Sequence, residues 1–490
     1  MGWKETAEPV LARMPGITRP GGHVAFKRKL AWTAGVLIVY FFLTNIFLYG
    51  MEGEGGDPFG GFRSILAGEQ GTIMQVGIGP IVTASIVMQL MSGADLLGLD
   101  TNDPRDQVLY QGMQKLLVIV MTALTAYPMV FMGGFLPASE GLAAQLGISV
   151  GMLQWLIFTQ VLIGGIIILF LDEVVSKWGI GSGIGLFIIA GVSQRMLGGI
   201  FSWPGLGERG ILVSWFDLIT GRTERPSLLT LDGVQEILIG EGHLLAIFTT
   251  LLIFGIVVYA ESVRVEIPLS HARVRGARGR FPVKLIYASV LPMILVRALQ
   301  MNVQFMGQIL NSRMGENMPA LLGQYDGDGN PVSGFFYYTN PIMRPQEWMW
   351  WLAEGPTQPL WMVGARVSVD LTVMIVGGAI FAIFWVETTN MGPEATAQQI
   401  QRSGMQIPGF RQNVGVYEKV LARYIPQVTI LGGALVGLLA VMANMLGTIG
   451  GVTGEGLLLT VSITYKLYEE IAEEQLMEMH PMMRQMFGRE

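Results

Sequence analysis

The stretch from Gly77 to Ile86 reads Gly-Ile-Gly-Pro-Ile-Val-Thr-Ala-Ser-Ile and lies inside a longer window without charged residues, 70–94. About 20 mostly apolar residues suffice for a helix to cross a bilayer, so this window predicts a membrane span. Pro80 frees a backbone carbonyl within that span. A membrane protein tolerates the freed group where neighbouring helices or a cavity satisfy it.

Further apolar windows of this length recur along the chain on both sides of a polar connector, 202–241. The predicted spans are 30–51, 70–94, 116–139, 141–171, 178–194, 242–260, 285–311, 371–386, 424–454 and 456–467. We therefore predict an all-α membrane protein with about ten transmembrane helices in two five-helix halves.

The predicted organisation follows from these windows. Its parts are a cytosolic N-terminal segment 1–29, a first half 30–201, an external connector 202–241, a second half 242–470 and a cytosolic tail 471–490. Because five spans are an odd number, the second half starts on the opposite side of the membrane and the two halves are inverted. Sites in inverted repeats tend to lie at their interface near the middle of the bilayer.

One feature of the second span in each half agrees with such a repeat. Pro80 and Pro292 interrupt these two spans, and amide side chains follow at Gln89, Gln300 and Asn302. Since transmembrane helices often contain proline, ordinary helix packing explains this feature equally well.

The composition supports the membrane class. Of 490 residues, 51% are hydrophobic and 14% are charged, against roughly 25% charged in soluble domains. The net charge of -6 argues against a nucleic-acid-binding protein, and the absence of cysteine excludes disulfides, thiolate metal sites and iron–sulfur clusters.

The cationic residues set the orientation. Lys and Arg gather in three segments, 4–29, 264–284 and 402–423, which a ten-span topology places on one side. Positive charge marks the cytoplasmic side of a membrane protein. We therefore predict a multi-pass cell-membrane protein with both termini in the cytoplasm.

Signatures of catalysis are missing. The four histidines form no metal-binding pair at helical spacing, and no phosphate-binding loop ends in Gly-Lys. Residues 326–330 begin like a calcium loop, but Pro331 stands where that loop requires glycine, so a tight turn is the better interpretation. We expect no enzyme activity, no cofactor and no metal.

Several strings resemble the SecY family, which forms the channel subunit of the Sec protein-conducting translocon. They are residues 77–86, 179–185, 266–269, 408–411 and 457–462. The resemblance extends over nearly the whole chain in the right order and is greatest to archaeal members. The acidic balance and a long external insert, 311–359, suggest a salt-adapted organism.

The resemblance implies an hourglass pore closed by a ring of branched aliphatic side chains. The ring positions are Ile78, Val82, Ile184, Ile188, Ile294 and Leu459. An apolar constriction offers an ion nothing in place of its hydration shell, so it blocks by dewetting. Without the family resemblance, ordinary helix packing would be the preferred interpretation of these residues.

The resemblance also implies a plug and a lateral gate. The plug falls on about 58–67, with Pro58, Phe59, Phe62, Ile65 and Leu66. The gate lies between spans two and three and spans seven and eight, where Thr83, Thr125 and Asn302 match its polar cluster. Thr125 is shorter than the polar side chain that relatives often carry there.

Ribosome docking is implied for the basic loops, through Arg273, Arg275, Arg278 and Arg411. Positive-inside topology alone also accounts for these charges. The implied partners are a SecE-type subunit, a small beta subunit, the ribosome, signal peptides, nascent chains and membrane lipid. The implied function is a passive channel that translocates secretory polypeptides and releases transmembrane segments laterally. The alternative is an inverted-repeat secondary transporter of a small solute, with a polar pocket near the middle of the membrane.

Arg297 departs from the family pattern, because relatives usually have a small or neutral residue there. It follows Ile294 by three residues and therefore shares roughly the same face of its helix. A bare charge at this depth is costly, so we predict a partner such as Asp370 or Glu455.

Overall fold

The computed structural model divides into two compact units. Unit 1 comprises Met1–Leu197, Met301–Tyr337 and Ile463–Glu490, and unit 2 comprises Gly198–Gln300 and Tyr338–Ser462. The structure describes residues 3–11, 13–22, 24–53, 57, 60, 63–93, 96–99, 103–132, 135–203, 209–222, 230–240, 242–271, 278–284, 291–326, 329–351, 358–389, 391–402, 405–406 and 413–479.

Unit 1 is built mainly from the N-terminal helices. They are α1 (Trp3–Leu11), α2 (Phe26–Leu43), α3 (Arg63–Leu66), α4 (Gly79–Gly93), α5 (Pro104–Phe131), α6 (Glu140–Leu146), α7 (Val150–Trp178) and most of α8 (Gly183–Phe201). It also takes in the C-terminal portions of α12 (Leu291–Met314) and α17 (Gly454–Met479), with η2 (Gly315–Asn317) and the first residues of α13 (Gly334–Thr339).

Unit 2 contains the N-terminal portions of α12 and α17 together with the remaining elements. They are α9 (Ile211–Thr220), α10 (Leu231–Leu238), α11 (Leu244–Ser262), β1 (Arg264–His271), β2 (Arg278–Lys284), η3 (Pro345–Glu347), α14 (Leu360–Thr388), α15 (Pro393–Arg402), β3 (Met405–Gln406), α16 (Val414–Leu446) and η4 (Ile449–Gly451).

The predicted membrane class is confirmed. Within the described residues, six helices are long and apolar enough to cross a membrane: α5, α7, α8, α11, α14 and α16. The other four predicted windows coincide with α2, α4, α12 and α17. An all-helical membrane architecture with about ten spans therefore fits the structure.

One predicted window, 141–171, is wrong in its bounds because the structure divides it into two helices. α6 ends at Gly147, whose φ of 66° is a left-handed helix cap. α7 then starts with the Ser149 side chain accepting from the Met152 N–H. A hydropathy window cannot detect this break, because glycine and serine do not interrupt an uncharged run.

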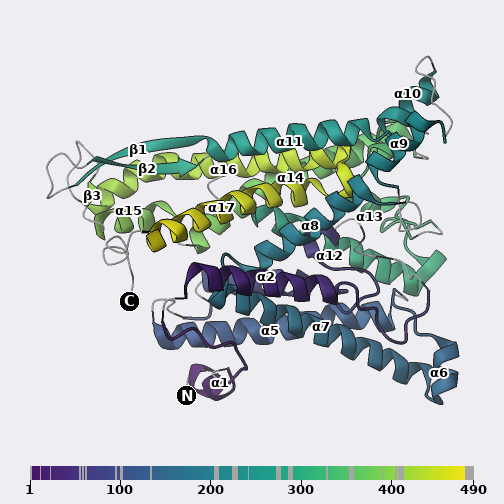
Figure 1. Cartoon of the computed structure of the whole chain (residues 1–490), viewed down its shortest axis with the longest axis horizontal. Helices are drawn as coiled ribbons and strands as arrows, with labels where there is room; N and C mark the ends of the chain where they lie inside the picture. Colours follow the sequence, from purple (N-terminus) through teal and green to yellow (C-terminus); the bar gives the residue numbers. More distant parts are fainter. Residues whose placement is uncertain are drawn as a thin grey trace. The chain divides into compact units, whose positions relative to one another are not determined.

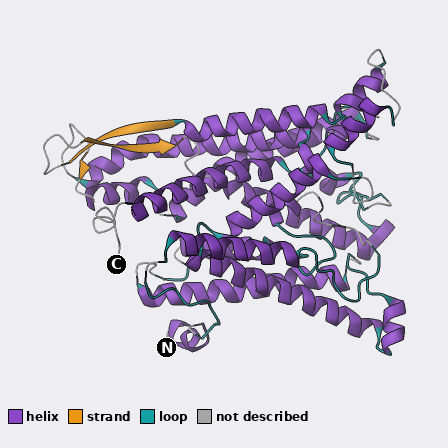
Figure 2. Cartoon of the chain, viewed as in Figure 1, coloured by secondary structure: helices purple, strands orange, loops and turns teal. Residues whose placement is uncertain are grey.

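A three-stranded antiparallel sheet, in the order β2-β1-β3, lies in the region expected only to form basic loops. Figure 2 shows its strands at the end of α11, from which β1 continues after a single residue. Val265, Ile267 and Leu269 alternate with other residue types along β1, which is the sequence signal of a strand. The expected loops at 264–284 and 402–423 are therefore partly strands.

Glycines permit the tightest packing in unit 2, where α14 and α16 run side by side (Figure 1). A Cβ atom at Gly437 would lie 2.3 Å from the Met374 carbonyl oxygen, and one at Gly433 would lie 2.6 Å from that of Gly378. Small residues let transmembrane backbones approach where apolar burial gives little driving force. The high glycine content of the chain therefore has a packing role here.

Candidate functional site

The predicted plug segment in unit 1 contains the short helix α3, and all four of its residues are buried. Ile65 and Leu66 are 4% and 8% exposed. Pro58, Phe59 and Phe62 lie outside the described residues. The helical part of the segment is thus enclosed by protein, as a piece too short to cross the bilayer must be.

Arg63 anchors this segment. Its Nε and Nη2 atoms donate to the two carboxylate oxygens of Asp57, at 2.8 and 2.7 Å, and its Nη1 donates to the Gln75 carbonyl oxygen at 2.5 Å. The arginine is only 2% exposed. A bidentate carboxylate is the arrangement that best compensates a buried guanidinium. The charge of the plug segment is therefore balanced from within the segment.

The end of the segment is bound to its surroundings by backbone oxygens. The Leu66 carbonyl accepts from the Ile78 N–H at 2.8 Å, and the Ala67 carbonyl accepts from the Tyr40 hydroxyl at 2.9 Å. Ala67 has a φ of 51°, which costs a residue with a Cβ roughly 1–2 kcal/mol. A Cβ atom on Gly77 would lie 2.1 Å from the Leu66 oxygen, so this close approach requires glycine.

Four predicted ring residues lie in unit 1, beside this segment in the chain or near it in space. Ile78 directly precedes α4 and Val82 lies in its first turn, whereas Ile184 and Ile188 lie on α8. Ile78 and Ile188 are buried, and Val82 and Ile184 are half-buried.

α8 is held in place at its N-terminus and along its length. The Ile184 N–H donates to the Asp172 carboxylate at 2.9 Å. The Phe187 ring stacks on Tyr40 with 5.0 Å between centroids. Because Tyr40 also binds Ala67, one side chain connects α2, α8 and the plug segment.

The other two ring residues lie in unit 2. Ile294 is on α12 and Leu459 is on α17, and they are 6% and 1% exposed. That all six residues form one ring stays a prediction.

A buried charge network lies one helical turn from each of these two residues. Arg297 donates through Nη1 to Asp370 Oδ1 at 2.8 Å and through Nε to Glu455. Its Nη1 also donates to the Gln300 amide oxygen at 2.7 Å. Arg297, Asp370 and Glu455 are each no more than 1% exposed. The prediction of a carboxylate partner for Arg297 is confirmed, and both candidates bind it.

Neutral groups extend the network, although Arg297 Nη2 is buried without a hydrogen-bond partner among the described residues. Asn444 Nδ2 lies 3.2 Å from each Glu455 carboxylate oxygen, and the Gly454 N–H donates to the Asn444 amide oxygen at 2.5 Å. Glu455 also lies in the first turn of α17, where the helix dipole favours a negative charge. Asp370 accepts the Ile342 N–H at 3.3 Å. The network therefore joins α12, α14, α16, α17 and the insert.

Residues 340–347 of the insert, which belong to unit 2, are attached to α14 by a second buried arginine of that unit. Arg366 of α14 donates to the Asn340 and Pro341 carbonyl oxygens, both at 2.8 Å, and to Glu347 at 2.6 Å. The Trp348 indole donates to the Met445 carbonyl oxygen at 2.8 Å. This part of the insert is thus tied to spanning helices rather than extending freely from them.

The predicted gate residues all lie in unit 1. The Thr83 hydroxyl donates to the Gly79 carbonyl and the Thr125 hydroxyl to the Met121 carbonyl, each at 2.9 Å within its own helix. The Asn302 side chain is exposed. Their role in a gate stays a prediction.

A polar contact between α4 and α5 was not anticipated. Gln114 Nε2 donates to the Ser85 hydroxyl at 2.8 Å and so connects the two helices. Ser85 belongs to the string 77–86, and an isolated serine in an apolar helix is the sequence signal for such a contact.

The structure describes little of the predicted docking residues. Arg273, Arg275 and Arg411 lie outside the described residues, whereas Arg278 is the first residue of β2. Their role stays a prediction.

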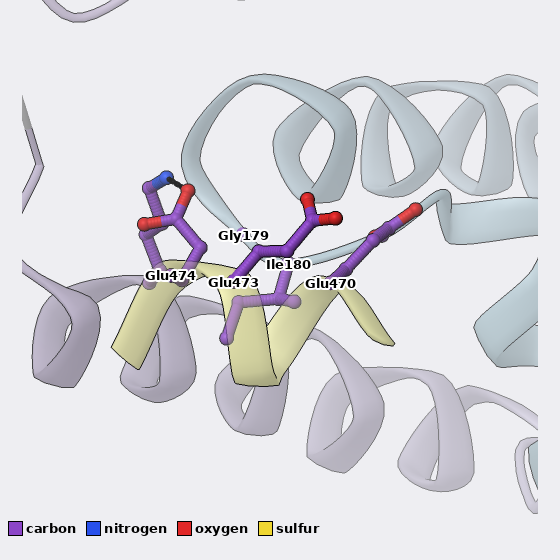
Figure 3. A pocket seen from close by; sticks show the side chains of 7 residues that line it. Gly179, Ile180, Glu470, Glu473 and Glu474 are labelled. Carbon is purple, nitrogen blue, oxygen red and sulfur yellow. Dashed lines mark hydrogen bonds and ion pairs between the residues drawn. The ribbon is translucent and has the colours of Figure 1, made fainter. Parts of the chain in front are cut away.

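A cavity of about 200 Å³ in unit 1 is lined by Lys29, Gly179, Ile180, Gly181, Glu470, Glu473 and Glu474. Figure 3 shows the three glutamates along α17, facing the turn before α8. Lys29 is ion-paired with Glu474, and the Ile180 N–H donates to the Thr33 hydroxyl at 3.0 Å. The cavity thus marks where α2, α17 and the start of α8 meet.

Two family models match consecutive parts of this chain. The family model SecY matches residues 72–468, and the model described as the plug domain of Sec61p matches residues 38–71. The protein translocase subunit SecY of Haloarcula marismortui is 68% identical, with 100% of each chain covered.

Two solved structures share the fold. One is described as the structure of a protein-conducting channel, with a TM-score of 0.77, 38% identity and coverage of 96% of this chain and 98% of that one. The other is Sec61 in the canine ribosome-channel complex from the endoplasmic reticulum, with a TM-score of 0.74, 38% identity and the same coverage. The expected resemblance to archaeal relatives is confirmed, and the chain belongs to the SecY family.

Proposed function

We propose that this chain is the channel subunit of a protein translocase, which conducts secretory polypeptides across the cytoplasmic membrane and releases transmembrane segments laterally into it. One observation carries the proposal: within the segment matched by the plug model, 38–71, the Leu66 carbonyl accepts a backbone hydrogen bond from Ile78, the first predicted ring residue. The family match favours this channel over a solute transporter.

The closed state combines two barriers. The aliphatic ring excludes ions because it replaces none of their hydration shell. The plug segment adds a solid obstruction, held by Arg63, by the Leu66–Ile78 hydrogen bond and by Tyr40. Branched aliphatic side chains also adapt to a passing chain of any sequence, so the same ring serves as a seal during transport.

The plug segment can leave without separating an ion pair. Asp57 and Arg63 belong to the same segment, so their pair travels with it. Departure breaks hydrogen bonds to the Gln75 carbonyl, the Ile78 N–H and the Tyr40 hydroxyl. With about 0.5–1.5 kcal/mol for each neutral bond and about 1.5–3 for the charged one, these three bonds contribute about 2.5–6 kcal/mol to the cost of release.

A signal sequence supplies energy on that scale. Its apolar core has about 7–15 residues, and ten residues at about 0.3–0.6 kcal/mol each supply about 3–6 kcal/mol. Shifting a gate from an open-to-closed ratio of 1:99 to one of 99:1 requires a ligand that binds the open state about 5.5 kcal/mol more tightly than the closed state. We therefore infer that signal binding opens the channel, and this chain acts as a passive conduit without nucleotide hydrolysis.

The proposed assembly includes a SecE-type subunit, a small beta subunit and the translating ribosome. Sec61, which is 38% identical to this chain, is found in a ribosome-channel complex. Arg273 and Arg275 fall in the residues that connect β1 to β2, and Arg278 begins β2. Basic side chains at these positions would contact phosphates of ribosomal RNA. Both termini then lie in the cytoplasm, as the positive charges favour.

Arg411→Glu tests ribosome docking. Reversal of one phosphate-contacting charge should weaken ribosome binding and reduce its dependence on salt concentration. Co-sedimentation with ribosomes measures this, and the membrane topology should not change. A variant that binds ribosomes normally but fails to insert would contradict the docking role.

Crosslinking tests the channel itself. A photoreactive residue at position 78 or 188 should crosslink to a secretory chain stalled during translocation. The same probe at Val161, which is fully buried on α7, serves as the control and should not react. Equal yields at all three positions, or none at 78 and 188, would reject the proposed path.

A further inference from the structure

The charge network in unit 2 has a regular spatial relation to the predicted ring. Arg297 follows Ile294 by three residues on α12, and Glu455 precedes Leu459 by four residues on α17. Residues at these spacings lie on the same face of a helix. The ion pair between Arg297 and Glu455 therefore joins the faces of α12 and α17 that carry the two ring residues.

The network also fixes where these helices stand relative to the rest of unit 2. Asp370 binds Arg297 from α14, and Asn444 binds Glu455 from α16. All five side chains, including Gln300, are at most 5% exposed. The planar guanidinium accepts partners only in fixed directions, so a sideways shift or rotation of α12 against α17 would break charged hydrogen bonds.

Buried ion pairs of this kind add little net stability over apolar side chains of similar size, because their desolvation offsets their attraction. Their best-attested benefit is that they select one arrangement among several that would pack comparably well. Aliphatic ring residues such as Ile294 and Leu459 cannot select an arrangement themselves, since apolar contacts have no direction.

We propose that Arg297 is a positioning residue for the closed pore: by binding Asp370 and Glu455 it holds the turns of α12 and α17 that carry Ile294 and Leu459 in one register, so that the ring excludes ions at rest. This inference rests on the proposed channel function. It assigns to the network a role in tightness of closure, which is distinct from a role in folding.

The main test removes the charges without leaving any of them unpaired. Arg297→Met combined with Asp370→Asn and Glu455→Gln keeps the network buried and neutral. The full-length variant, reconstituted with its partner subunits into lipid vesicles, should still translocate a secretory polypeptide. Its resting ion leak should rise about tenfold, which corresponds to about 1.4 kcal/mol and falls within the coupling measured in salt-bridge networks.

A matched control separates this effect from the loss of any buried ion pair. Arg366→Met with Glu347→Gln removes the pair between the buried Arg366 and the half-buried Glu347 that attaches the insert to α14, and it involves neither α12 nor α17. Its resting leak should stay within about twofold of the wild-type value, since it lies outside the proposed network.

A milder variant keeps the inference testable if the triple variant fails to fold. Glu455→Gln retains a hydrogen-bond acceptor for Arg297 and leaves Arg297 paired with Asp370. It should raise the leak by about two- to fivefold, as expected for loss of one interaction within a network. A folded Glu455→Gln or triple variant with the leak of the wild type would overturn the inference, as would an equal rise in the control.

The two proposals fail in different ways. If the wild-type assembly conducts no polypeptide, the channel function is wrong. If it conducts polypeptide but the variants leak no more than it does, only the positioning role is wrong.

Discussion

Two buried arginines, Arg63 in unit 1 and Arg297 in unit 2, are compensated in opposite ways. Arg63 pairs with Asp57, only six residues away in the same segment. Arg297 pairs with Asp370 and Glu455, which are 73 and 158 residues away on other helices. Both arginines are at most 2% exposed. The difference lies in what each carboxylate is attached to.

This difference suits the plug segment to movement and the helices around Arg297 to a fixed position. A pair enclosed within one segment remains intact when the segment leaves, so the motion does not have to separate these two charges. A network that spans four helices loses charged bonds with any relative displacement, and an uncompensated buried charge is expensive. The arrangement of countercharges thus agrees with a mobile plug and a fixed frame.

The largest expected effect is that of Arg297→Ala. It leaves Asp370 and Glu455 buried without a cation and should destabilise the protein by about 3–5 kcal/mol. Thermal unfolding in detergent measures the loss. Adding Asp370→Asn and Glu455→Gln to the same variant should recover most of it. An Arg297→Ala protein as stable as the wild type would show that the network is dispensable for stability. It would contradict the contrast between Arg297 and Arg63.

A smaller effect is expected from Arg63→Ala, because Asp57 is 17% exposed and can be hydrated. The variant loses the anchor to Gln75 and should release the plug segment more often. Because the chain has no cysteine, Ile65→Cys provides a single reactive thiol. Its labelling rate should rise about tenfold in Arg63→Ala, which corresponds to about 1.4 kcal/mol.

Asp57→Asn is the control for that experiment, since it preserves the Arg63 bond to Gln75 and should accelerate labelling less. An unchanged rate in Arg63→Ala would mean that the anchor does not restrain the segment.

The smallest effect is expected for a pair exposed to water. Arg105 donates to the Glu8 carboxylate, and this hydrogen bond holds the pKa of Glu8 below its usual value of 4.5. A lowered pKa in the folded state stabilises the protein above about pH 4.5, and the contribution disappears as the pH falls through the lowered pKa. High salt also screens it.

Glu8→Gln should therefore lower the midpoint temperature of thermal unfolding slightly at pH 7 and low salt. It should not change this temperature at low pH or in molar salt. A shift that persists at low pH and in molar salt would show that this surface pair behaves like a buried one. It would contradict the expected difference between exposed and buried pairs.

Sequence patterns predicted the parts of this protein that depend on local composition. Each apolar window contains a helix, because the free energy of transferring a segment into lipid depends on how apolar about 20 consecutive residues are. They also predicted that Arg297 has a carboxylate partner, since a bare charge in a membrane span is costly whatever its surroundings. The order of the motifs was sufficient to identify the SecY family.

Other features were missed because they depend on distant or single residues. The helix break at Gly147 is set by one backbone conformation inside an uncharged run. The Gln114–Ser85 contact and the sheet formed by β1, β2 and β3 require segments that meet only after folding. Asp57, the carboxylate partner of Arg63, lies just before the predicted plug, and no sequence pattern marks it as a partner.

The sequence by itself therefore determined the membrane class, the spans, the family and the need for countercharges. Only the tertiary structure decided that Arg297 binds both carboxylates and that Asn444, Gln300 and the Ile342 backbone join the network. The physical reason is that the cost of burying a charge is fixed by the residue and its depth, whereas the choice of partner is fixed by which side chains come within hydrogen-bond distance once the helices have packed.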